Sequence, residues 1–406
     1  MQKKQIIVIG AGYAGMMTAI RLAGRTRNLK NITITLINGN DQFIERPRLH
    51  EVATGVDVPQ YPVEDMLKGT GVNFVKGWVT ALQAQQNRIS LQTESGNQEL
   101  AYDYLVYAPG SSIRKPLDGI DEFAYVLHPY GNNNAEAMRE ALEAYENRHG
   151  RVLVIGSGAT GIEGAAHVKS LYPHLDVVIV SRNRFASFRG ERVERHIRQS
   201  FEKQKIQIIE NNGVIELTES SAKLRDGQEI IYDICLWAGG FIASPLAKDS
   251  GLQVNDDNQI IGDPYCRSLE YENIFVVGDA LKMKVNPGVD ARMSIMMAMV
   301  SGAHTADNLN RLLRGRKLKP MSFSYYGQGI AMGINDAAGF GTWRGDKIYS
   351  PIFRGRVGVT MRNFFVVLLR VFLTAERYFP GAFIWLGQNR YAAQQRRQAQ
   401  QAKATS

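Results

Sequence analysis

Two glycine patterns, each set between an apolar run and a helix-favouring run, constrain the fold of this 406-residue chain more than any other feature. The first pattern is Gly10-Ala-Gly12-Tyr-Ala-Gly15, and the second is Gly156-Ser-Gly158-Ala-Thr-Gly161. Such glycines permit a tight turn, close approach of the backbone to a pyrophosphate, and close packing of a helix whose N-terminus attracts negative charge. Two such patterns in one chain predict two dinucleotide-binding folds.

Each glycine pattern lies inside a predicted strand–helix–strand unit. The elements of the two units are strand Gln5–Ile9, a helix to about Ala23 and strand Ile32–Ile37, then strand Arg151–Ile155, helix Ala159–Ser170 ending near Pro173, and strand Asp176–Val180. Between them, Asn87–Gln98 and Glu99–Tyr107 alternate like antiparallel strands. We therefore expect an α/β protein with two Rossmann-type domains of three layers each (ββα), the second inserted in the first, plus a C-terminal domain.

Two strands that end in glycine turns indicate where the chain returns to a nucleotide-binding domain. Tyr104–Val106 leads into Ala108-Pro109-Gly110, and Tyr232–Trp237 leads into Ala238-Gly239-Gly240. A Met- and Ala-rich segment from about Met293 to Leu313 reads as a long helix, and from Pro320 the sequence becomes aromatic and glycine-rich. The expected domains are 1–118 with 243–319, 119–242, and 320–406.

Composition limits the classes of function. A formal net charge of +9 favours phosphate-bearing cofactors or an anionic membrane surface, and no nucleic-acid-binding motif is present, so we expect no nucleic-acid partner. Cys235 and Cys266 form neither a CxxC pair nor a metal-ligand cluster, so we expect neither a disulfide framework nor a metal site. The apolar run Ile6–Ile9 is too short for a signal peptide, which predicts a cytoplasmic protein.

A third motif brings the sequence close to a known group. Asn273-Ile-Phe-Val-Val-Gly278-Asp279-Ala280, with both glycine patterns and Tyr104-Leu-Val-Tyr-Ala-Pro-Gly110, resembles the pyridine-nucleotide flavoproteins. The resemblance implies FAD in the first domain, with Asp279 on the ribityl chain and the following helix directed at the isoalloxazine ring, and NADH or NADPH in the second domain.

Within that group the chain is most similar to the type II NADH:quinone oxidoreductases. The stretches that carry this similarity are Leu49-His-Glu-Val-Ala-Thr-Gly55, Gly158-Ala-Thr-Gly-Ile-Glu163 and an aromatic, amphipathic C-terminus. The resemblance implies hydride transfer from NAD(P)H to FAD and then two-electron transfer to a quinone or another small acceptor. It implies proton handling by Glu163, although a carboxylate in the first turn of a helix also stabilises that helix without catalysis.

Two departures from the group bear on the acceptor. The chain has no cysteine before Cys235, which excludes a redox-active disulfide beside the flavin. The helix after Asp279 reads Arg292-Met-Ser-Ile-Met-Met-Ala298 where the quinone reductases usually carry glutamines, so the acceptor stays open between a quinone and another small molecule.

The expected contacts to the cofactors follow from these motifs. Asn38 ends the strand at which an acidic residue usually binds ribose, and its amide can also hydrogen-bond a ribose hydroxyl. Ser181 and Arg182 end the matching strand of the second domain, where the absence of a carboxylate favours NADPH over NADH. Arg48 and His50 lie in the loop that resembles the flavin-side segment, as contacts or as structural residues. The full set of expected cofactor contacts is Gly10, Gly12, Gly15, Asn38, Arg48, Gly110, Gly156, Gly158, Gly161, Ser181, Arg182, Gly240, Gly278 and Asp279.

The C-terminal region contains a predicted amphipathic helix that could contact a membrane or another protein surface. On a helix over Asn363–Phe379, the polar residues Asn363, Arg370, Thr374 and Arg377 share one stripe, and the other faces are apolar except at Glu376. Such a helix lies in a membrane interface, forms a homodimer contact or caps the core. The Arg-rich tail from Asn389 would add attraction to anionic lipid on the inner face of the membrane.

Two other functions fit the same motifs. One is a soluble flavin dehydrogenase that acts on a specialised small molecule in an apolar pocket. The other is a redox-sensing protein that resembles the apoptosis-inducing-factor-like flavoproteins, in which turnover is minor.

Overall fold

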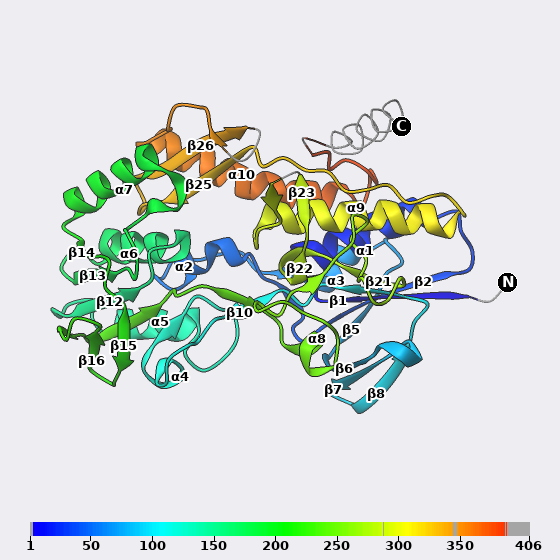
Figure 1. The fold of residues 1–406 in the computed structure, drawn as a ribbon, viewed down its shortest axis with the longest axis horizontal. Helices are drawn as coiled ribbons and strands as arrows, with labels where there is room; N and C mark the ends of the chain where they lie inside the picture. The colour runs from blue at the N-terminus through cyan, green and yellow to red at the C-terminus, as the bar shows by residue number, and fades with distance from the viewer. Residues whose placement is uncertain (1–2, 287, 344–346, 386, 388–406) are drawn as a thin grey trace, which may run out of the picture.

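The computed structural model describes residues 3–286, 288–343, 347–385 and 387. Two five-stranded parallel sheets lie next to each other along its longest axis (Figure 1). The strands of the first sheet, in spatial order, are β21 (Ile274–Val276), β9 (Tyr104–Tyr107), β1 (Lys4–Ile9), β2 (Ile32–Asn38) and β5 (Asn73–Lys76). Those of the second are β11 (Tyr125–Val126), β18 (Ile234–Trp237), β12 (Arg151–Ile155), β13 (Asp176–Val180) and β14 (Gln207–Ile209). The prediction of two Rossmann-type domains is confirmed.

Helices and small antiparallel sheets form the outer layers. Helices α1 (Tyr13–Thr26) and α9 (Ile295–Leu313) pack against each other over the first sheet, and α6 (Ala159–Leu171) follows β12 in the second domain. The antiparallel layers are β6 (Trp78–Gln83), β7 (Arg88–Thr93) and β8 (Gly96–Ala101) in the first domain, and β15 (Val214–Leu217), β16 (Ser221–Leu224) and β17 (Glu229–Ile231) in the second. The expected antiparallel pair is therefore present, but its turn follows Thr93, within the segment predicted as one strand.

The strands are buried on both sides, and their sequences explain this. Residues Ile6–Ile9 and Val152–Ile155 are continuous apolar runs and are almost inaccessible. Continuous rather than alternating apolar runs are typical of parallel strands covered on both faces.

The chain passes between the domains along two paired strands. β10 (Ser111–Ile113) leaves the first domain and β19 (Phe241–Ala243) returns to it, and the two pair antiparallel. The expected insertion of the second domain into the first is therefore made through one short two-stranded link.

The C-terminal region lies across both domains, along the top of Figure 1. Strands β25 (Gly327–Ala331), β26 (Ala337–Trp343) and β27 (Lys347–Ile348) form a small sheet beside α10 (Gly355–Ala375). Its buried side chains divide between neighbours: Met321, Leu373 and Phe383 join the core of the first domain, and Ile330 and Phe340 join that of the second. In the part of the chain that the structure describes, this region contributes to the cores of both domains.

Short elements complete the fold. They are β3 (Gln42–Phe43), η1 (Arg46–Arg48), α2 (Leu49–Val52), β4 (Tyr61–Pro62), α3 (Val63–Leu67), η2 (Ala84–Gln86), α4 (Ile120–Phe123), α5 (Ala135–Glu143), η3 (Ser187–Arg189), α7 (Glu191–Gln204), α8 (Leu246–Asp249), β20 (Ile260–Ile261), η4 (Gly278–Ala280), β22 (Leu281–Lys282), β23 (Lys284–Asn286) and β24 (Val289–Asp290).

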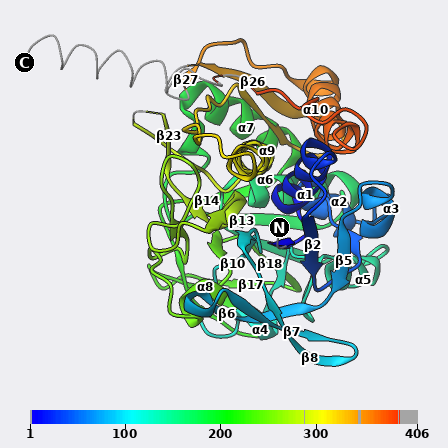
Figure 2. The ribbon, with the colours of Figure 1, turned by 90° about the vertical axis from the view of Figure 1, so that its right-hand side faces the viewer.

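Helix α10 is attached to the protein through charged side chains and leaves several apolar side chains exposed. It spans Gly355–Ala375, so it begins and ends earlier than predicted. Arg362 is 7% exposed and, with Arg370, binds carboxylates of the first domain, whereas Phe364 is 60% exposed. Figure 2 places α10 on the outer edge of the molecule, beside α1. The charged side chains attach the helix to the protein, and much of its apolar face is exposed. The predicted basic tail lies outside the described residues.

Candidate cofactor and active site

The two glycine turns have the same geometry. Gly10 and Gly156 have φ of +96° and +115°, and a Cβ there would lie 2.1 and 2.4 Å from the carbonyl oxygens of Ala108 and Ala238. In each turn the third glycine packs against the first: a Cβ on Gly15 or Gly161 would lie 1.8 Å from the carbonyl oxygen of Gly10 or Gly156. Only glycine fits these positions, so both turns permit the same close approach of strand and helix.

A cavity of about 420 Å³ opens above the first turn. It extends from the first glycine turn and the end of β2, past Gly110 and η4, to the start of α9, and residues of the second domain close its far side. Of the expected contacts, it is lined by Gly10, Gly12, Asn38, Gly110, Glu163, Gly278 and Asp279. Gly15 packs beneath the turn, and the remaining expected contacts lie outside this lining.

The cavity has the donors and acceptors that a flavin dinucleotide needs. Arg46 lines it, and its Nη2 is buried without a hydrogen-bond partner in the described residues. A guanidinium with free N–H groups beside a glycine turn suits a pyrophosphate. Asp279 accepts a hydrogen bond from Ser111 Oγ at 2.6 Å, which orients its carboxylate at the cavity. The residues present therefore fit FAD.

Arg48 and His50 were both expected near the flavin, but of the arginines in this turn Arg46 lines the cavity and Arg48 does not. Arg46 and His50 line the cavity, whereas Arg48 binds Glu51 and Glu45 at 2.7 and 3.5 Å. The side-chain direction in this short helical turn is set by tertiary packing, and the Arg-Pro-Arg sequence alone does not say which arginine faces inward. Contact between Arg48 and a cofactor remains a prediction.

The second glycine turn meets the end of β13 through two hydroxyl groups. Ser157 Oγ and Ser181 Oγ lie 2.6 Å apart. Arg182 is exposed, while Arg184 binds Glu194 at 2.9 Å, which compensates its charge. Of the two arginines, Arg182 is therefore the cation left free to meet a ligand at this strand end.

Glu163 lies where the two domains meet. It comes from α6 of the second domain and lines the cavity of the first. Burial raises the pKa of its carboxyl group to about 7, although the charge of Arg362 and the N–H of Ala331 act in the opposite direction. That N–H donates to Glu163 Oε1 at 3.1 Å. A carboxyl group with this pKa exchanges protons readily at neutral pH.

Histidines stand behind this carboxylate. His50 Nδ1 lies 4.0 Å from Glu163 Oε2, and the His50 ring meets the His167 ring edge-on at 4.6 Å between centroids. Burial lowers the pKa of His50 well below its ordinary value and that of His167 to about 4, so both rings are neutral at physiological pH.

The fold and the site define a class: oxidoreductases that hold a flavin and a nicotinamide dinucleotide in two Rossmann-type domains. The model of one family within it, pyridine nucleotide-disulphide oxidoreductase, matches residues 4–304. The chain belongs to that family.

Relatives support the same class. The chain is 26% identical over 359 residues to a demethylphylloquinone reductase from Synechocystis, with 82% of this chain and 86% of the relative covered. It is 25% identical to a type II NADH:quinone oxidoreductase from Staphylococcus aureus over 372 residues, covering 83% and 89%.

Solved structures match the fold. NDH2 from Plasmodium falciparum, solved with NADH, superposes with a TM-score of 0.77 at 16% identity and covers 93% of this chain and 97% of its own. A sulfide:quinone oxidoreductase from Aquifex aeolicus gives a TM-score of 0.73 at 18% identity, with 92% of each chain covered.

The two cysteines are placed as core residues. Cys235 and Cys266 are buried, and neither lines the cavity. Burial also raises the pKa of both thiols, which opposes formation of the reactive thiolate. The chain thus lacks the reactive disulfide for which its family is named.

Proposed function

We propose that this protein is a membrane-surface NAD(P)H:quinone oxidoreductase, in which Glu163 handles the proton that accompanies reduction of the acceptor. Flavin bound in the cavity supplies hydride acceptance from NAD(P)H and two-electron donation. The residues around it bind, orient and exchange protons. The observation that carries the proposal is a carboxyl group of pKa about 7 that the second domain inserts into the cavity of the first.

The acceptor side differs from the pattern expected of a quinone site. Where glutamines are usual, the side chains at the start of α9 that line the cavity are Met293, Ser294, Ile295 and Ala298. Mostly apolar groups of this kind accommodate a flat apolar acceptor with few hydrogen bonds. We infer that quinone headgroups are held here mainly by packing.

An anaerobic titration separates the two half-reactions. NADH or NADPH is added to the yellow protein, and flavin absorbance is followed before and after addition of acceptors. We expect rapid bleaching by the nicotinamide and rapid recovery with a soluble quinone. If none of the quinones restored the flavin absorbance, and a long-lived charge-transfer band formed, the proposal would be contradicted and a redox sensor favoured.

The apolar face of α10 supports attachment to a membrane. Phe364, Phe365 and Val371 are exposed on the helix, and Phe379 and Ile384 beyond it are each 73% exposed. The helix is long and apolar enough to span a bilayer by length and composition alone. Its buried arginine contacts instead hold it along the protein, an arrangement typical of an interfacial helix.

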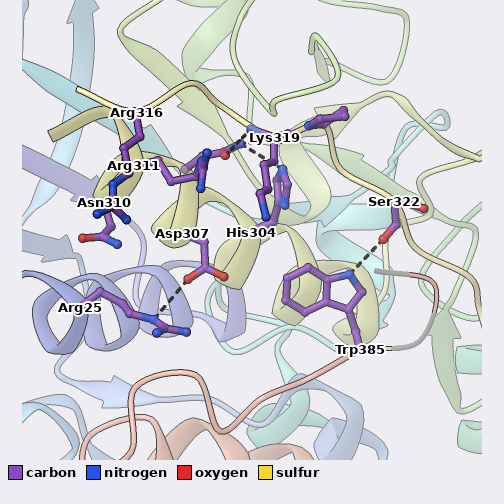
Figure 3. Close-up of a pocket in the computed structure, with 11 residues that line it drawn as sticks. Arg25, His304, Asp307, Asn310, Arg311, Arg316, Lys319, Ser322 and Trp385 are labelled. Carbon is purple, nitrogen blue, oxygen red and sulfur yellow. Dashed lines mark hydrogen bonds and ion pairs between the residues drawn. The ribbon is translucent and has the colours of Figure 1, made fainter. Parts of the chain in front are cut away.

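Basic side chains lie beside this apolar surface. A pocket of about 270 Å³ at the ends of α1 and α9 is lined by Arg25, Arg311, Arg316, Lys319 and Trp385 (Figure 3). Arg25 pairs with Asp307 at 3.5 Å, and the described residues hold no carboxylate within ion-pair distance of the other three cations. Cations next to exposed apolar groups attract an anionic lipid surface. We therefore propose that the protein is peripheral on the cytoplasmic face of the membrane.

Vesicle sedimentation tests this attachment. The full chain should sediment with anionic vesicles, and F364E/V371E should reduce the bound fraction about tenfold, because each charge must leave the lipid interface. I231E is the matched control, since Ile231 is an exposed apolar residue on β17 of the second domain. Loss of a dimer on gel filtration without any vesicle binding would assign this face to a homodimer.

A further inference from the structure

Arg362 of α10 contacts His50, which lines the cavity, and its other contacts are those of a buried, fixed group. Its Nη1 donates to Glu51 Oε1 at 2.7 Å, and its Nη2 donates to the carbonyl oxygen of Pro47 at 2.9 Å. The same Nη2 lies 3.4 Å from His50 Nε2. Three contacts to η1 and α2 thus hold the guanidinium against the back of His50.

The contact with Arg362 determines where the proton of His50 sits. A guanidinium only donates, so the nitrogen that faces it must present a lone pair. Glu51 Oε1 lies 3.9 Å from the same nitrogen, too far to accept a hydrogen bond from it, and instead accepts from Arg362, while Glu51 Oε2 accepts from Arg48 at 2.7 Å. His50 Nε2 is therefore the acceptor, and a neutral ring must carry its proton on Nδ1.

The Nδ1 nitrogen faces Glu163. Its distance of 4.0 Å from Glu163 Oε2 is beyond hydrogen-bond range, and Oε1 accepts from the N–H of Ala331. The two groups that face the carboxyl, His50 Nδ1–H and the N–H of Ala331, are then both N–H groups. When Glu163 is protonated, neither neighbour can accept its proton, so that proton is directed at the cavity.

We propose that Arg362 is a positioning residue that fixes the Nδ1–H tautomer of His50 and so directs the proton of Glu163 to the acceptor. The proposal rests on the role of Glu163 in the proposed function. With the other tautomer, His50 Nδ1 would accept the proton of Glu163 and withhold it from the cavity. Because Arg362 belongs to α10, the seating of the apolar helix and the proton supply of the cavity depend on the same side chain.

The pH dependence of acceptor reduction is set by the charged and titratable groups on every element that packs against Glu163. The carboxyl of Glu163 is faced by His50 on α2 and is influenced by the charges of Glu51 on α2 and Arg362 on α10, and His167 on its own helix meets the ring of His50. The positive charge of Arg362 lowers the pKa of Glu163, and the negative charge of Glu51 raises it. Loss of Arg362 alone should therefore raise the pH at which acceptor reduction titrates, by about one unit.

The test uses the flavin-loaded protein labelled with ¹⁵N-histidine. Nitrogen chemical shifts distinguish protonated from unprotonated ring nitrogens, and the His50→Gln variant assigns the signals. We expect His50 in the Nδ1–H form in the wild type and in R362K, which retains a donor-only cation, and a mixture or the Nε2–H form in R362Q. The control R370Q removes a cation from the same helix, but that cation binds Glu45 and Tyr61.

The pH profile of flavin reoxidation is the second readout. R362Q should shift its midpoint upward by about one unit, and R370Q should not shift it. An Nε2–H form in the wild type, or an unchanged tautomer in R362Q, would overturn the proposal. A changed tautomer with an unchanged profile would also overturn it. Unaltered kinetics in E163Q would instead refute the role of Glu163 in the proposed function, because the tautomer is measured without turnover.

Discussion

The two Rossmann-type domains share the order of four parallel strands and the same glycine turn, but they differ where the turn meets the second strand. In the first domain Asn38 Oδ1 accepts from the N–H of Ala11 at 3.0 Å, and Asn38 Nδ2 donates to the carbonyl oxygen of Asn40 at 2.7 Å. In the second domain the equivalent link joins the hydroxyls of Ser157 and Ser181. The shared backbone fixes the approach to a pyrophosphate, and the strand-end side chain sets which ribose is accepted.

The domains also differ at the equivalent position of the helix. Counting from the third glycine, Met17 of the first domain corresponds to Glu163 of the second. Met17 is fully buried in the core, whereas Glu163 projects into the other domain's cavity. Duplication thus supplies two similar binding folds, and a few side chains at their junction supply the chemistry.

A matched pair of glycine substitutions, one in each domain, should have the largest effect and should separate the two cofactor sites. Gly12 and Gly158 have φ of −76° and −71°, and a Cβ on either meets nothing within 4 Å, so a side chain is tolerated by the fold. A glutamate would place charge and bulk where the pyrophosphate approaches. We expect G12E to be colourless, and G158E to retain flavin but to be reduced by NADH at least ~100-fold more slowly. Flavin loss in both variants would mean that the two sites are not independent.

Glu163→Gln should slow flavin reoxidation by about 100-fold while leaving flavin bound. The amide has the size of the carboxyl group but cannot release or take up a proton near neutral pH. In the wild type the rate should fall as pH rises through about 7, where the carboxyl group loses its proton, and E163Q should lack this step. Stopped-flow absorbance measured over about four pH units around neutrality gives the reoxidation rate of each protein and its pH dependence. Equal rates in the two proteins would reduce Glu163 to a helix-stabilising residue.

Protein stability gives an independent check on the same carboxyl group. Its pKa is raised in the folded state, so folded protein holds a proton that the unfolded chain releases between pH 4.5 and about 7. The contribution to stability is therefore lost as pH rises through that window. Denaturant unfolding should show a smaller loss in E163Q than in the wild type.

The strand end of the second domain should set the nicotinamide preference. We expect the wild type to favour NADPH, since Arg182 can pair with a 2′-phosphate, a contact worth about 1.5–3 kcal/mol. In S181E/R182A the ratio of the rates of flavin reduction by NADPH and by NADH should fall by about tenfold or more. A wild type that already prefers NADH by that margin would show that Arg182 is not a phosphate ligand.

Asn38→Ala should give the smallest effect. It removes the hydrogen bond from Ala11 of the turn and the hydrogen bond to Asn40 beyond the strand, so flavin affinity should weaken by about tenfold or less. Equilibrium dialysis of the flavin checks this. The control S181A makes the same kind of change in the second domain and should leave flavin affinity unaltered.

Much of the fold could be predicted because its signals are local. Continuous apolar strands, glycine turns and the duplicated order placed both sheets close to their observed bounds. The site was predicted in part: Gly10, Gly278, Asp279 and Glu163 are brought to one cavity, because their motifs carry a backbone geometry. Arg46 and Arg362 were missed, since their partners Ser111 and Glu51 are distant in the sequence and leave no periodic trace. The amphipathic pattern of α10 left its surroundings open, because Arg362 precedes the predicted helix and Glu376, read as an interruption, is a buried partner of Arg21.

The paired strands β10 and β19 bring the two ends of the second domain together. Ile113 is paired with Phe241, and paired Cα atoms of antiparallel strands are about 5 Å apart. The chain between these two residues could be exchanged for another nucleotide-binding module with adjacent ends, provided that the new module also covers Ile330 and Phe340 of the C-terminal region. Chimeras made at this junction would change the nicotinamide preference of the protein while keeping its flavin site.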